Sequence, residues 1–561
     1  MTFFQINNCF NLSLPRLSSA FVIVVSLLLI VGCDSFLTDD YMSIDTPLKR
    51  VREIQSIQLE DKSSSEPVSV DDAAAEMIDL TINPPKPPPQ LDLTLAEVRA
   101  AALENNLDLQ VELVSPSIAQ ATVDEEEAKF EAVFFGSASR QRFDGPTAVG
   151  TEGTEATIDS YDLGVRIPLR TGGTATIDLP FNKQETNNPF SLLNPAFSSD
   201  LRFSISHPLL RNAGQRVNTH SIRVAKYDSQ IANARTKLES IRILANADRT
   251  YWLLYAAKRE LEVRQKQYEL ATAQLEQARR KVTAGDVAQI EITRAQSGVA
   301  SRLEAIIIAQ TTVRATQRDL KRIMNRPDQP INSVTDIIPT TLPQPVGLDL
   351  PADELADFAV ENRMEMLELE LQLAIDASTV DLQRNARLPL VTLDYTYNIN
   401  GLGSSFGKSF DQLSDRSFED WSLGVSAEIP IGNQRAKARV HRAVLQRVQR
   451  LSTKQQRELA IRQEVYDAID QLDQNWQRIL AARQEVILAG RTYDAERRQF
   501  DVGIRTSTDV LDAATDLADA QSREIRALTD YQISQIDLAF ATGTLLGRDR
   551  IRWEPIEASD D

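Results

Sequence analysis

Hydrophobic positions along this chain follow two periods, and the first of them is helical. Between residues 215 and 284 there is neither Gly nor Pro, and apolar residues recur every seven positions. The recurring residues are Val224, Ile231, Leu238, Ala245 and Trp252. A sustained heptad predicts a long helix that packs as a coiled coil. At about 1.5 Å per residue this helix would reach roughly 100 Å. Gly285 ends the pattern, and a returning helix is predicted as far as Met324.

The second period is two, and it marks strands. The alternating segments are 161–169, 174–181 and 201–206, followed in the second half by 391–397 and 421–429. Alternation over about nine residues predicts a strand with one apolar face, and it suits a transmembrane barrel strand of roughly 9–11 residues. A soluble β-sandwich gives the same alternation, so that alternative stays open. Segments rich in Gly, Ser and Asn at 182–199 and 400–405 predict loops.

The two periods occur twice because the chain repeats itself. The stretch RRKVTAG at 279–285 returns as RRQFDVG at 497–503, a spacing of 218 residues. The stretch ALEN at 102–105 returns as AVEN at 359–362, a spacing of 257. The two spacings indicate one duplication with about 39 more residues in the first copy. We expect these residues to form an additional strand pair, 161–169 and 174–181, and leave open whether that pair joins a barrel wall.

The duplication predicts the domain organisation. The first repeat, 91–324, has a helix from the capping box of Thr94 and Glu97 to about Phe130, then strands in 131–208 and a helical hairpin in 215–324. The second repeat, 352–548, has a helix, strands in 390–431 and a helical hairpin in 433–546. A Pro-rich linker, 325–351, joins the repeats, and an acidic tail, 549–561, ends the chain.

The N-terminal segment resembles a bacterial lipoprotein signal peptide. Its apolar run, 21–31, is too short to span a bilayer as a helix, and it ends just before Gly32 and Cys33. The resemblance implies that residues 1–32 are removed and that Cys33 is lipidated. The alternative is an ordinary signal peptide or anchor in which Cys33 is incidental. Residues 33–90 are predicted to be a disordered, Pro-rich tether.

Composition then excludes several functions. The formal net charge of −19 argues against a nucleic-acid partner, because phosphate binding needs a basic surface. Three His and two Cys without ligand spacing predict no metal site and no cofactor. We find no Gly-rich phosphate loop and no Cys/His pair, so no enzyme activity is expected.

A sheet exposed to lipid cannot leave an open edge, because each unpaired backbone group in hydrocarbon costs several kcal/mol. The smallest closed membrane barrels have about eight strands, whereas this chain offers four to six. Either the sheet lies outside a membrane, or several chains complete one barrel. The second of these alternatives gives a fold class that is mainly α with a membrane β-barrel portion, built from a duplicated strand pair and a long coiled-coil hairpin.

At this point the chain resembles the TolC-type outer-membrane efflux proteins over about residues 91–548. The resemblance is carried chiefly by FDVGIRTSTDVLDAA at 500–514, where the family has an aromatic residue, Gly, Arg-Thr and Asp-Val-Leu-Asp-Ala. Supporting segments are ALENN at 102–106, the strand entry RLP at 387–389, and the strand exits that begin at Pro208 and Pro430. The resemblance implies three protomers that form a twelve-stranded barrel in the outer membrane above a periplasmic α-helical tube. It also implies a passive conduit that docks onto a periplasmic adaptor (membrane fusion) protein and an inner-membrane pump, for efflux or type I secretion.

The resemblance further implies a gate at the periplasmic tip of the helices. The matching positions are Glu291 in the first copy and Phe500, Arg505, Asp509 and Asp512 in the second. Gly285 and Gly503 are the hairpin turns. Phe500 stands where the gating pattern has Tyr, so one hydrogen bond is lost. Acids repeated by a three-fold axis would attract cations, but Asp509 and Asp512 in the first turns of a helix could instead offset the helix dipole.

The competing function is a periplasmic coiled-coil adaptor or scaffold lipoprotein. Such adaptors also have long hairpins and lipid anchors, but they need one hairpin and a soluble β domain. Strand pairs placed symmetrically in both copies favour the channel, and a lipid-anchored location in the bacterial outer membrane is expected.

Overall fold

The computed structural model describes residues 88–554 except 148, 150, 152, 286, 287 and 503, together with residues 63, 64, 66, 68–70 and 73. The chain divides into two units, Met1–Asp79 and Leu80–Asp561, and the second unit contains all the elements from β1 onward. The predicted signal peptide, Cys33 and Gly503 lie outside the described residues, and so does most of the predicted tether.

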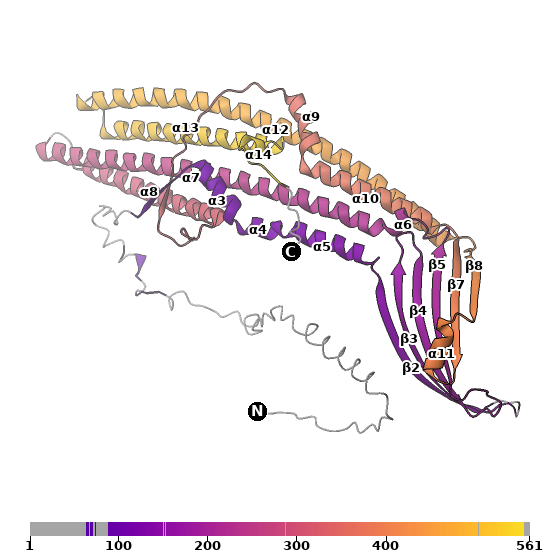
Figure 1. The fold of residues 1–561 in the computed structure, drawn as a ribbon. Helices are drawn as coiled ribbons and strands as arrows, with labels where there is room; N and C mark the ends of the chain where they lie inside the picture. Colours follow the sequence, from indigo (N-terminus) through magenta and orange to yellow (C-terminus); the bar gives the residue numbers. More distant parts are fainter. Residues whose placement is uncertain are drawn as a thin grey trace. The chain divides into compact units, whose positions relative to one another are not determined.

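Two long helical hairpins form the larger part of the second unit (Figure 1). In the first, α6 (Gln215–Asn218) leads into α7 (His220–Ala284), which returns as α8 (Ile290–Met324). In the second, α12 (Gln434–Asp501) returns as α13 (Ser507–Ala541), and α14 (Leu545–Arg548) comes after it. These are the helices that the heptad pattern predicts, with one short break at Thr219.

The helix that opens the first copy is broken, so the prediction of a single helix to about Phe130 is wrong. The capping box of Thr94 and Glu97 is confirmed at the start of α3 (Leu95–Asn105). The side chain of Asn106 then caps α4 (Leu107–Leu113), and α5 (Ser115–Ala128) begins with a Pro in its first turn. The second copy has only one break, between α9 (Ala352–Asn362) and α10 (Met364–Ala386).

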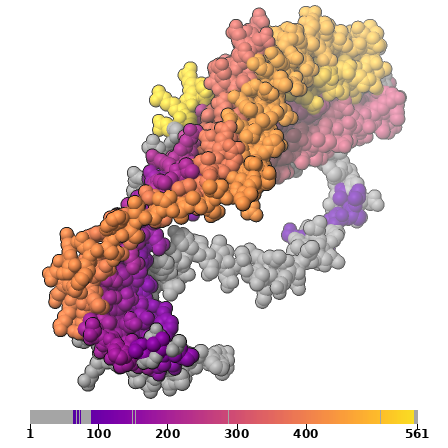
Figure 2. Space-filling view, turned by 90° about the vertical axis from the view of Figure 1, so that its right-hand side faces the viewer, coloured from indigo at the N-terminus to yellow at the C-terminus, as the bar shows by residue number. Residues whose placement is uncertain are grey.

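Six antiparallel strands form one sheet at the far end of the hairpins (Figure 1). They are β2 (Val133–Asp144), β3 (Glu155–Pro168), β4 (Thr174–Thr186), β5 (Ala196–Pro208), β7 (Leu390–Gly403) and β8 (Glu419–Glu428). Their order in the sheet is their order in the sequence, so β5 of the first copy pairs with β7 of the second. In Figure 2 the two groups of strands accordingly form one continuous surface, purple beside orange.

The additional strand pair of the first copy is confirmed as β3 and β4, and it joins the sheet between β2 and β5. The predicted loops were partly wrong. Much of 182–199 continues β4 and β5, because these residues pair with neighbouring strands. Residues 400–403 extend β7, and a helix, α11 (Phe406–Ser414), comes directly after them.

The main core lies where α3, α7 and α8 meet the linker between the copies. Leu244, Tyr251 and Leu254 are fully buried there. The Pro-rich linker contains one short strand, β6 (Asp336–Pro339), which pairs in parallel with β1 (Gln90–Leu93). Among the residues that the structure describes, no helix is both long and apolar enough to cross a membrane.

Candidate functional site

Both hairpin turns lie at the same end of the helical part, opposite the sheet (Figure 1). The predicted gate residues belong to these turns or to the helix ends beside them. Glu291 stands in the first turn of α8, Phe500 near the end of α12, and Asp509 in the first turn of α13. The structure therefore brings both motifs of the repeat to one end of the unit.

The turn of the first copy depends on Gly285. This residue caps α7 with φ of 85°, in the left-handed region that favours glycine. A few residues later, Glu291 forms an ion pair of 2.6 Å with Arg294 on the same helix. Gln289, which precedes α8, makes no side-chain cap. The acidic side chain of the first tip is therefore held by a neighbour on its own helix.

The turn of the second copy carries a full capping box. The backbone N–H and the hydroxyl of Thr506 each donate to Asp509 Oδ2 at 2.8 Å, and the backbone N–H of Asp509 donates to Thr506 Oγ1 at 3.3 Å. These bonds, the backbone bond first, and the nearby charge of Arg505 lower the pKa of Asp509. Asp509 therefore caps α13 within a single chain, which is the helix-end role considered for it.

Arg505 also binds within its own hairpin. Its Nε lies 3.1 Å from Glu496 Oε2 and donates to Gln499 Oε1 at 3.2 Å. Asp512 is exposed on α13. In the described part of the chain, no hydrogen bond or ion pair joins Glu291, Arg505, Asp509 and Asp512 to one another. One chain alone thus brings these groups to a common end without linking them.

The two tips are linked by a contact that the sequence did not reveal. Phe500 is only 7% exposed, and the Nζ of Lys281 lies 3.7 Å from the centre of its ring. This cation–π contact joins the end of α12 to the end of α7. Further along, Arg302 of α8 donates to Thr515 Oγ1 of α13 at 2.6 Å. Lys281 belongs to the repeated motif, and Gln499 is the corresponding residue of the second copy. The repeat does not indicate that Lys281 contacts Phe500.

The breaks in the short helices form a second polar region, halfway along the hairpins. In the first copy, buried Asn106 accepts from the N–H of Leu109 at 3.0 Å and donates to the carbonyl of Ile323 at 2.9 Å. The corresponding break of the second copy carries Arg363, whose side chain is 4% exposed.

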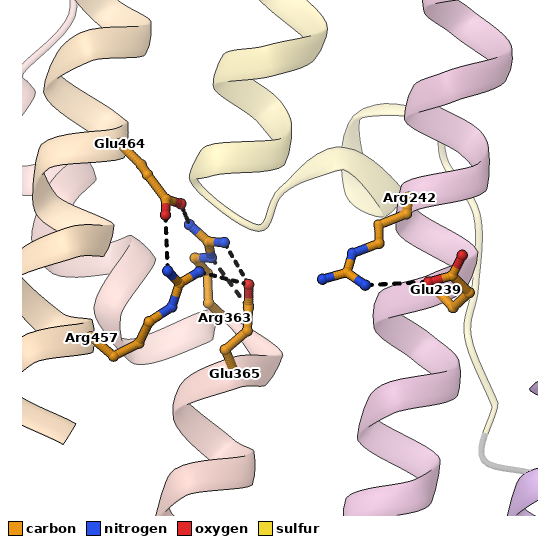
Figure 3. A network of polar contacts seen from close by, with 6 residues as sticks. All are labelled: Glu239, Arg242, Arg363, Glu365, Arg457 and Glu464. Carbon is orange, nitrogen blue, oxygen red and sulfur yellow. Dashed lines mark hydrogen bonds and ion pairs between the residues drawn. The ribbon is translucent and has the colours of Figure 1, made fainter. Parts of the chain in front are cut away.

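Arg363 lies inside a network of four charges (Figure 3). It pairs with Glu365 at 2.5 Å and with Glu464, and Arg457 pairs with the same two acids at 3.1 and 3.0 Å. Burial alone would raise the pKa of Glu365, but the hydrogen bond from Arg363 and the two positive charges outweigh it, so its pKa is lowered. The network joins α9, α10 and α12 through alternating positive and negative side chains.

The sheet has two chemically different faces. One face carries apolar side chains from every strand, in rows that the register defines; one such row is Phe134, Val165, Ile177, Phe203, Tyr397 and Trp421. The other face carries mostly Ser, Thr, Asn, Asp and Arg; its members include Ser160, Asp178, Arg202, Thr396 and Ser422. Both faces of β2 and β8 are almost entirely exposed. A sheet that is apolar on one side and polar on the other can separate a hydrocarbon phase from water.

Comparison with known proteins supports this geometry. Residues 355–544 match the family described as outer membrane efflux protein. The chain is 23% identical over 341 residues to the outer membrane protein TolC of Vibrio cholerae, covering 60% of this chain and 75% of that protein. It is 24% identical over 316 residues to TolC of Escherichia coli K12, covering 55% of this chain and 62% of that protein.

Solved structures show the same fold over 80% of this chain. The CmeC outer membrane channel of Campylobacter jejuni matches with a TM-score of 0.60 and 17% identity, over 80% of this chain and 86% of that one. The MtrE outer membrane channel of Neisseria gonorrhoeae matches with a TM-score of 0.57 and 16% identity, over 80% of this chain and 89% of that one. The resemblance drawn from the sequence is thereby confirmed: residues 355–544 match the outer membrane efflux protein family, and the relatives and solved structures similar to this chain are TolC proteins and outer membrane channels.

Proposed function

We propose that this chain is the outer-membrane channel of an efflux system, a passive conduit across the outer membrane and the periplasm. The observation that carries the proposal is the six-stranded sheet, which has one apolar face, one polar face and two unpaired edges, at the end of two long helical hairpins. The relatives and the solved structures that match are outer-membrane proteins and channels, which fits a protein without catalytic activity.

Several copies are needed for this function. A lipid-exposed sheet needs partners for its edge groups, and six strands are fewer than the roughly eight of the smallest closed membrane barrels. We infer a homotrimer, as the family resemblance implies, with the apolar face of each sheet toward outer-membrane lipid. The hairpins would extend as a helical tube into the periplasm and meet an adaptor protein and an inner-membrane pump.

The gate is proposed at the tips of this tube. In a trimer, Glu291, Asp509 and Asp512 would each be present three times near the axis, where they would favour cations. Asp512 is the best candidate for the constriction, because it is exposed and Asp509 is already engaged in its capping box. Phe500 has no hydroxyl for a latch, and its contact with Lys281 supports a latch that acts between the two hairpins of one chain.

Planar-bilayer recording tests the conduit and the gate together. Purified wild-type protein should insert and conduct, and Asp512→Ala should change the single-channel conductance or the cation selectivity. Glu354→Ala is a matched control, because Glu354 is an exposed acid in the first turn of α9, far from the tips. Absence of any conductance from outer-membrane fractions would reject the channel, whereas unchanged selectivity in Asp512→Ala would reject only the gate assignment.

Fractionation separates the channel from the adaptor alternative. A channel should sediment with outer membranes and migrate differently in detergent gels before and after heating, as closed barrels do. A soluble periplasmic scaffold on a lipid anchor would show no such heat dependence. The proposed anchor at Cys33 can be tested separately: labelled fatty acid should be incorporated into the wild-type protein and not into Cys33→Ser.

A further inference from the structure

The two edges of the sheet are equivalent in their exposure and complementary in direction. Every residue of β8 is exposed, and so is every residue of β2 except Phe135. The sheet has six strands, all antiparallel to their neighbours, so β2 and β8 run in opposite directions. If β8 of one copy meets β2 of the next, the new pair is therefore antiparallel like all the others, and the alternation continues around a closed wall.

The side chains restrict how these strands can pair. The residues of the apolar face have odd numbers on β8 and even numbers on β2. When the two strands pair, residues of the same face must lie opposite each other. Two registers satisfy this condition and also pair all of β8 with β2. In the first, Glu428 lies opposite Val133, and in the second it lies opposite Phe135.

Charge distinguishes the two registers. In the first, Glu419 lies opposite Arg142, Trp421 opposite Arg140 and Leu423 opposite Ala138. In the second, Glu419 lies opposite Asp144 and Leu423 opposite Arg140. Like charges directly opposite each other are destabilising, and opposite charges are favourable. Arg142, whose side chain is 69% exposed and also 3.6 Å from Glu155 of its own copy, is free to turn toward a second acid.

The first register also gives the strands a reasonable tilt. Within one copy, the row of directly opposed residues that begins at Trp421 on β8 ends at Phe134 on β2. In the first register, Trp421 would also lie opposite Arg140 on β2 of the next copy, and Arg140 is six residues further along that strand than Phe134. An offset of six residues over six strands, at about 3.4 Å per residue and about 4.8 Å per strand, corresponds to a tilt of about 35°. Membrane barrels have strands tilted by about 35–45°, and pairing without an offset would leave them upright.

The helices continue both edges as apolar stripes. Before β2, the side chains of Leu107 and Val111 on α4, of Val114 between the helices and of Ile118 on α5 are exposed. Just after β8, the exposed side chains Leu445, Val448, Leu451 and Leu459 lie on α12. Each unpaired strand edge is thus continuous with an apolar helix surface that this copy leaves uncovered, which is what an interface between copies requires.

We propose that β8 of one copy pairs with β2 of the next in the register that places Trp421 opposite Arg140, so that three copies close an eighteen-stranded barrel. The count of three rests on the proposed function, and the six strands per copy come from the sheet itself. The diameter of a barrel grows roughly linearly with its strand number, so this wall would be about half as wide again as a twelve-stranded one. The outer-membrane part would then be a wide pore, and the helical tips would be the narrow part of the conduit.

Cysteine crosslinking tests both the pairing and the count. In the proposed register Ser139 lies opposite Ser422 on the polar face, and Ala138 lies opposite Leu423 on the other. In an antiparallel pair, successive opposed residues alternate between hydrogen-bonded and non-hydrogen-bonded positions. The two cysteine pairs therefore include one position of each kind, and one of them has the geometry that suits a disulfide. Oxidation of outer membranes that contain Ser139→Cys with Ser422→Cys, or Ala138→Cys with Leu423→Cys, should give a reducible covalent trimer in denaturing gels. The single variants control for Cys33.

The matched control is Gln141→Cys with Ser422→Cys, which fits the rejected register. Stronger crosslinking there would overturn the register, a product that stops at a dimer would overturn the eighteen strands, and no product in any pair would overturn the edge pairing. If wild-type protein still conducts in that last case, the channel function stands and only this inference fails.

Two measurements do not depend on cysteine. Native mass spectrometry of the extracted wild-type protein counts its copies directly, and any number other than three would overturn the barrel. Arg142→Glu should lower the yield of the assembled form several-fold, and adding Glu419→Arg should restore it. Failure of the second substitution to restore the yield would overturn the proposed register.

Discussion

The two copies of the repeat differ most in the segments that connect their strands at the end of the sheet farthest from the helical hairpins. Each copy has two framing strands, β2 and β5 in the first and β7 and β8 in the second. Between them the first copy inserts the hairpin of β3 and β4, which widens the sheet, and the second inserts α11, which lies on the sheet. The returning helices α8 and α13 nevertheless both have 35 residues. Insertions at the strand turns therefore change the sheet while the hairpins keep their length.

The insertions fit their places for different physical reasons. The strands β3 and β4 alternate apolar and polar residues in phase with their neighbours, so they extend both faces of the sheet. The helix α11 needs a surface without side chains, which Gly401 and Gly403 provide. A Cβ on Gly401 would lie 2.0 Å from the carbonyl oxygen of Ser409. Phe406 of α11 packs edge-on against Phe197, with ring centres 4.6 Å apart.

Removing the hairpin of the first copy should have the largest effect. A short turn in place of residues 145–195 would join β2 directly to β5, and the two strands would still be antiparallel. We expect a narrower barrel, because each copy would contribute four strands. The variant should exclude uncharged polymers that enter the wild-type pore in planar bilayers. The same polymer cutoff in both proteins would contradict a wall that includes β3 and β4.

The helix breaks offer the next comparison, and there the cost should depend on charge. Arg363→Ala removes a buried cation from Glu365 and Glu464, and breaking a buried ion pair costs about 3–5 kcal/mol. Asn106→Ala removes a cap and one buried hydrogen bond at the equivalent break, which costs about 1–2 kcal/mol. Thermal unfolding in detergent should show the larger loss for Arg363→Ala. An equal loss of stability in both variants would mean that the charge network of Arg363 contributes no more to stability than the helix cap of Asn106 does.

The second insertion can be tested through its glycine. Gly401→Ala should displace α11, because the new methyl group would overlap backbone atoms of that helix. Trypsin added to intact cells should then cleave the protein more readily at Lys408 or Arg416. Gly424→Ala is the matched control, since a Cβ on this strand glycine would meet nothing within 4 Å. Equal protection of both variants would show that α11 does not depend on the glycine surface.

Asp549, at the end of the second copy, forms an ion pair with Arg99 of the first copy, and its carboxyl group has an unusual pKa. Burial raises the pKa of Asp549 to about 6, with repulsion from Asp248 adding to it and the attraction of Arg99, 2.8 Å away, acting against it. Asp549 therefore keeps its proton to a higher pH in the folded state than in the unfolded chain. Its contribution to stability is complete below about pH 4 and is lost as the pH rises to about 6.

Asp549→Asn should remove this loss. The melting temperature of the variant, relative to wild type, should increase between pH 4 and pH 6 and stay constant above that range. Glu554→Gln serves as a control, because Glu554 is an exposed acid five residues further on. A constant difference across the whole range would show that Asp549 is already ionised at pH 4.

Much of this architecture could be predicted from the sequence, because it depends on regular periods. The heptad in α7, the alternation in β3 and β4, and the capping box at Thr94 each state a local preference that the fold obeys. What could not be predicted depends on contacts between distant segments. Lys281 meets Phe500 only because α7 and α12 end together, and most of the Asn- and Gly-rich sequence at 400–405 became strand because β5 pairs with it.

The smallest effect is expected at the starts of the returning helices, where the copies differ by one cap. Thr506 caps α13 with its side chain, whereas Gln289 makes no such bond at the start of α8. Thr506→Ala should destabilise the first turn of α13 by about 1 kcal/mol, and Gln289→Ala should leave α8 unchanged. Hydrogen exchange of the N-terminal amides of α13 is the direct measurement. Faster exchange in Thr506→Ala without altered cation selectivity would mean that the cap holds the helix end while Asp512 sets the charge of the opening. Altered selectivity in the same variant would mean instead that Asp509, once released from the cap, also faces the pore.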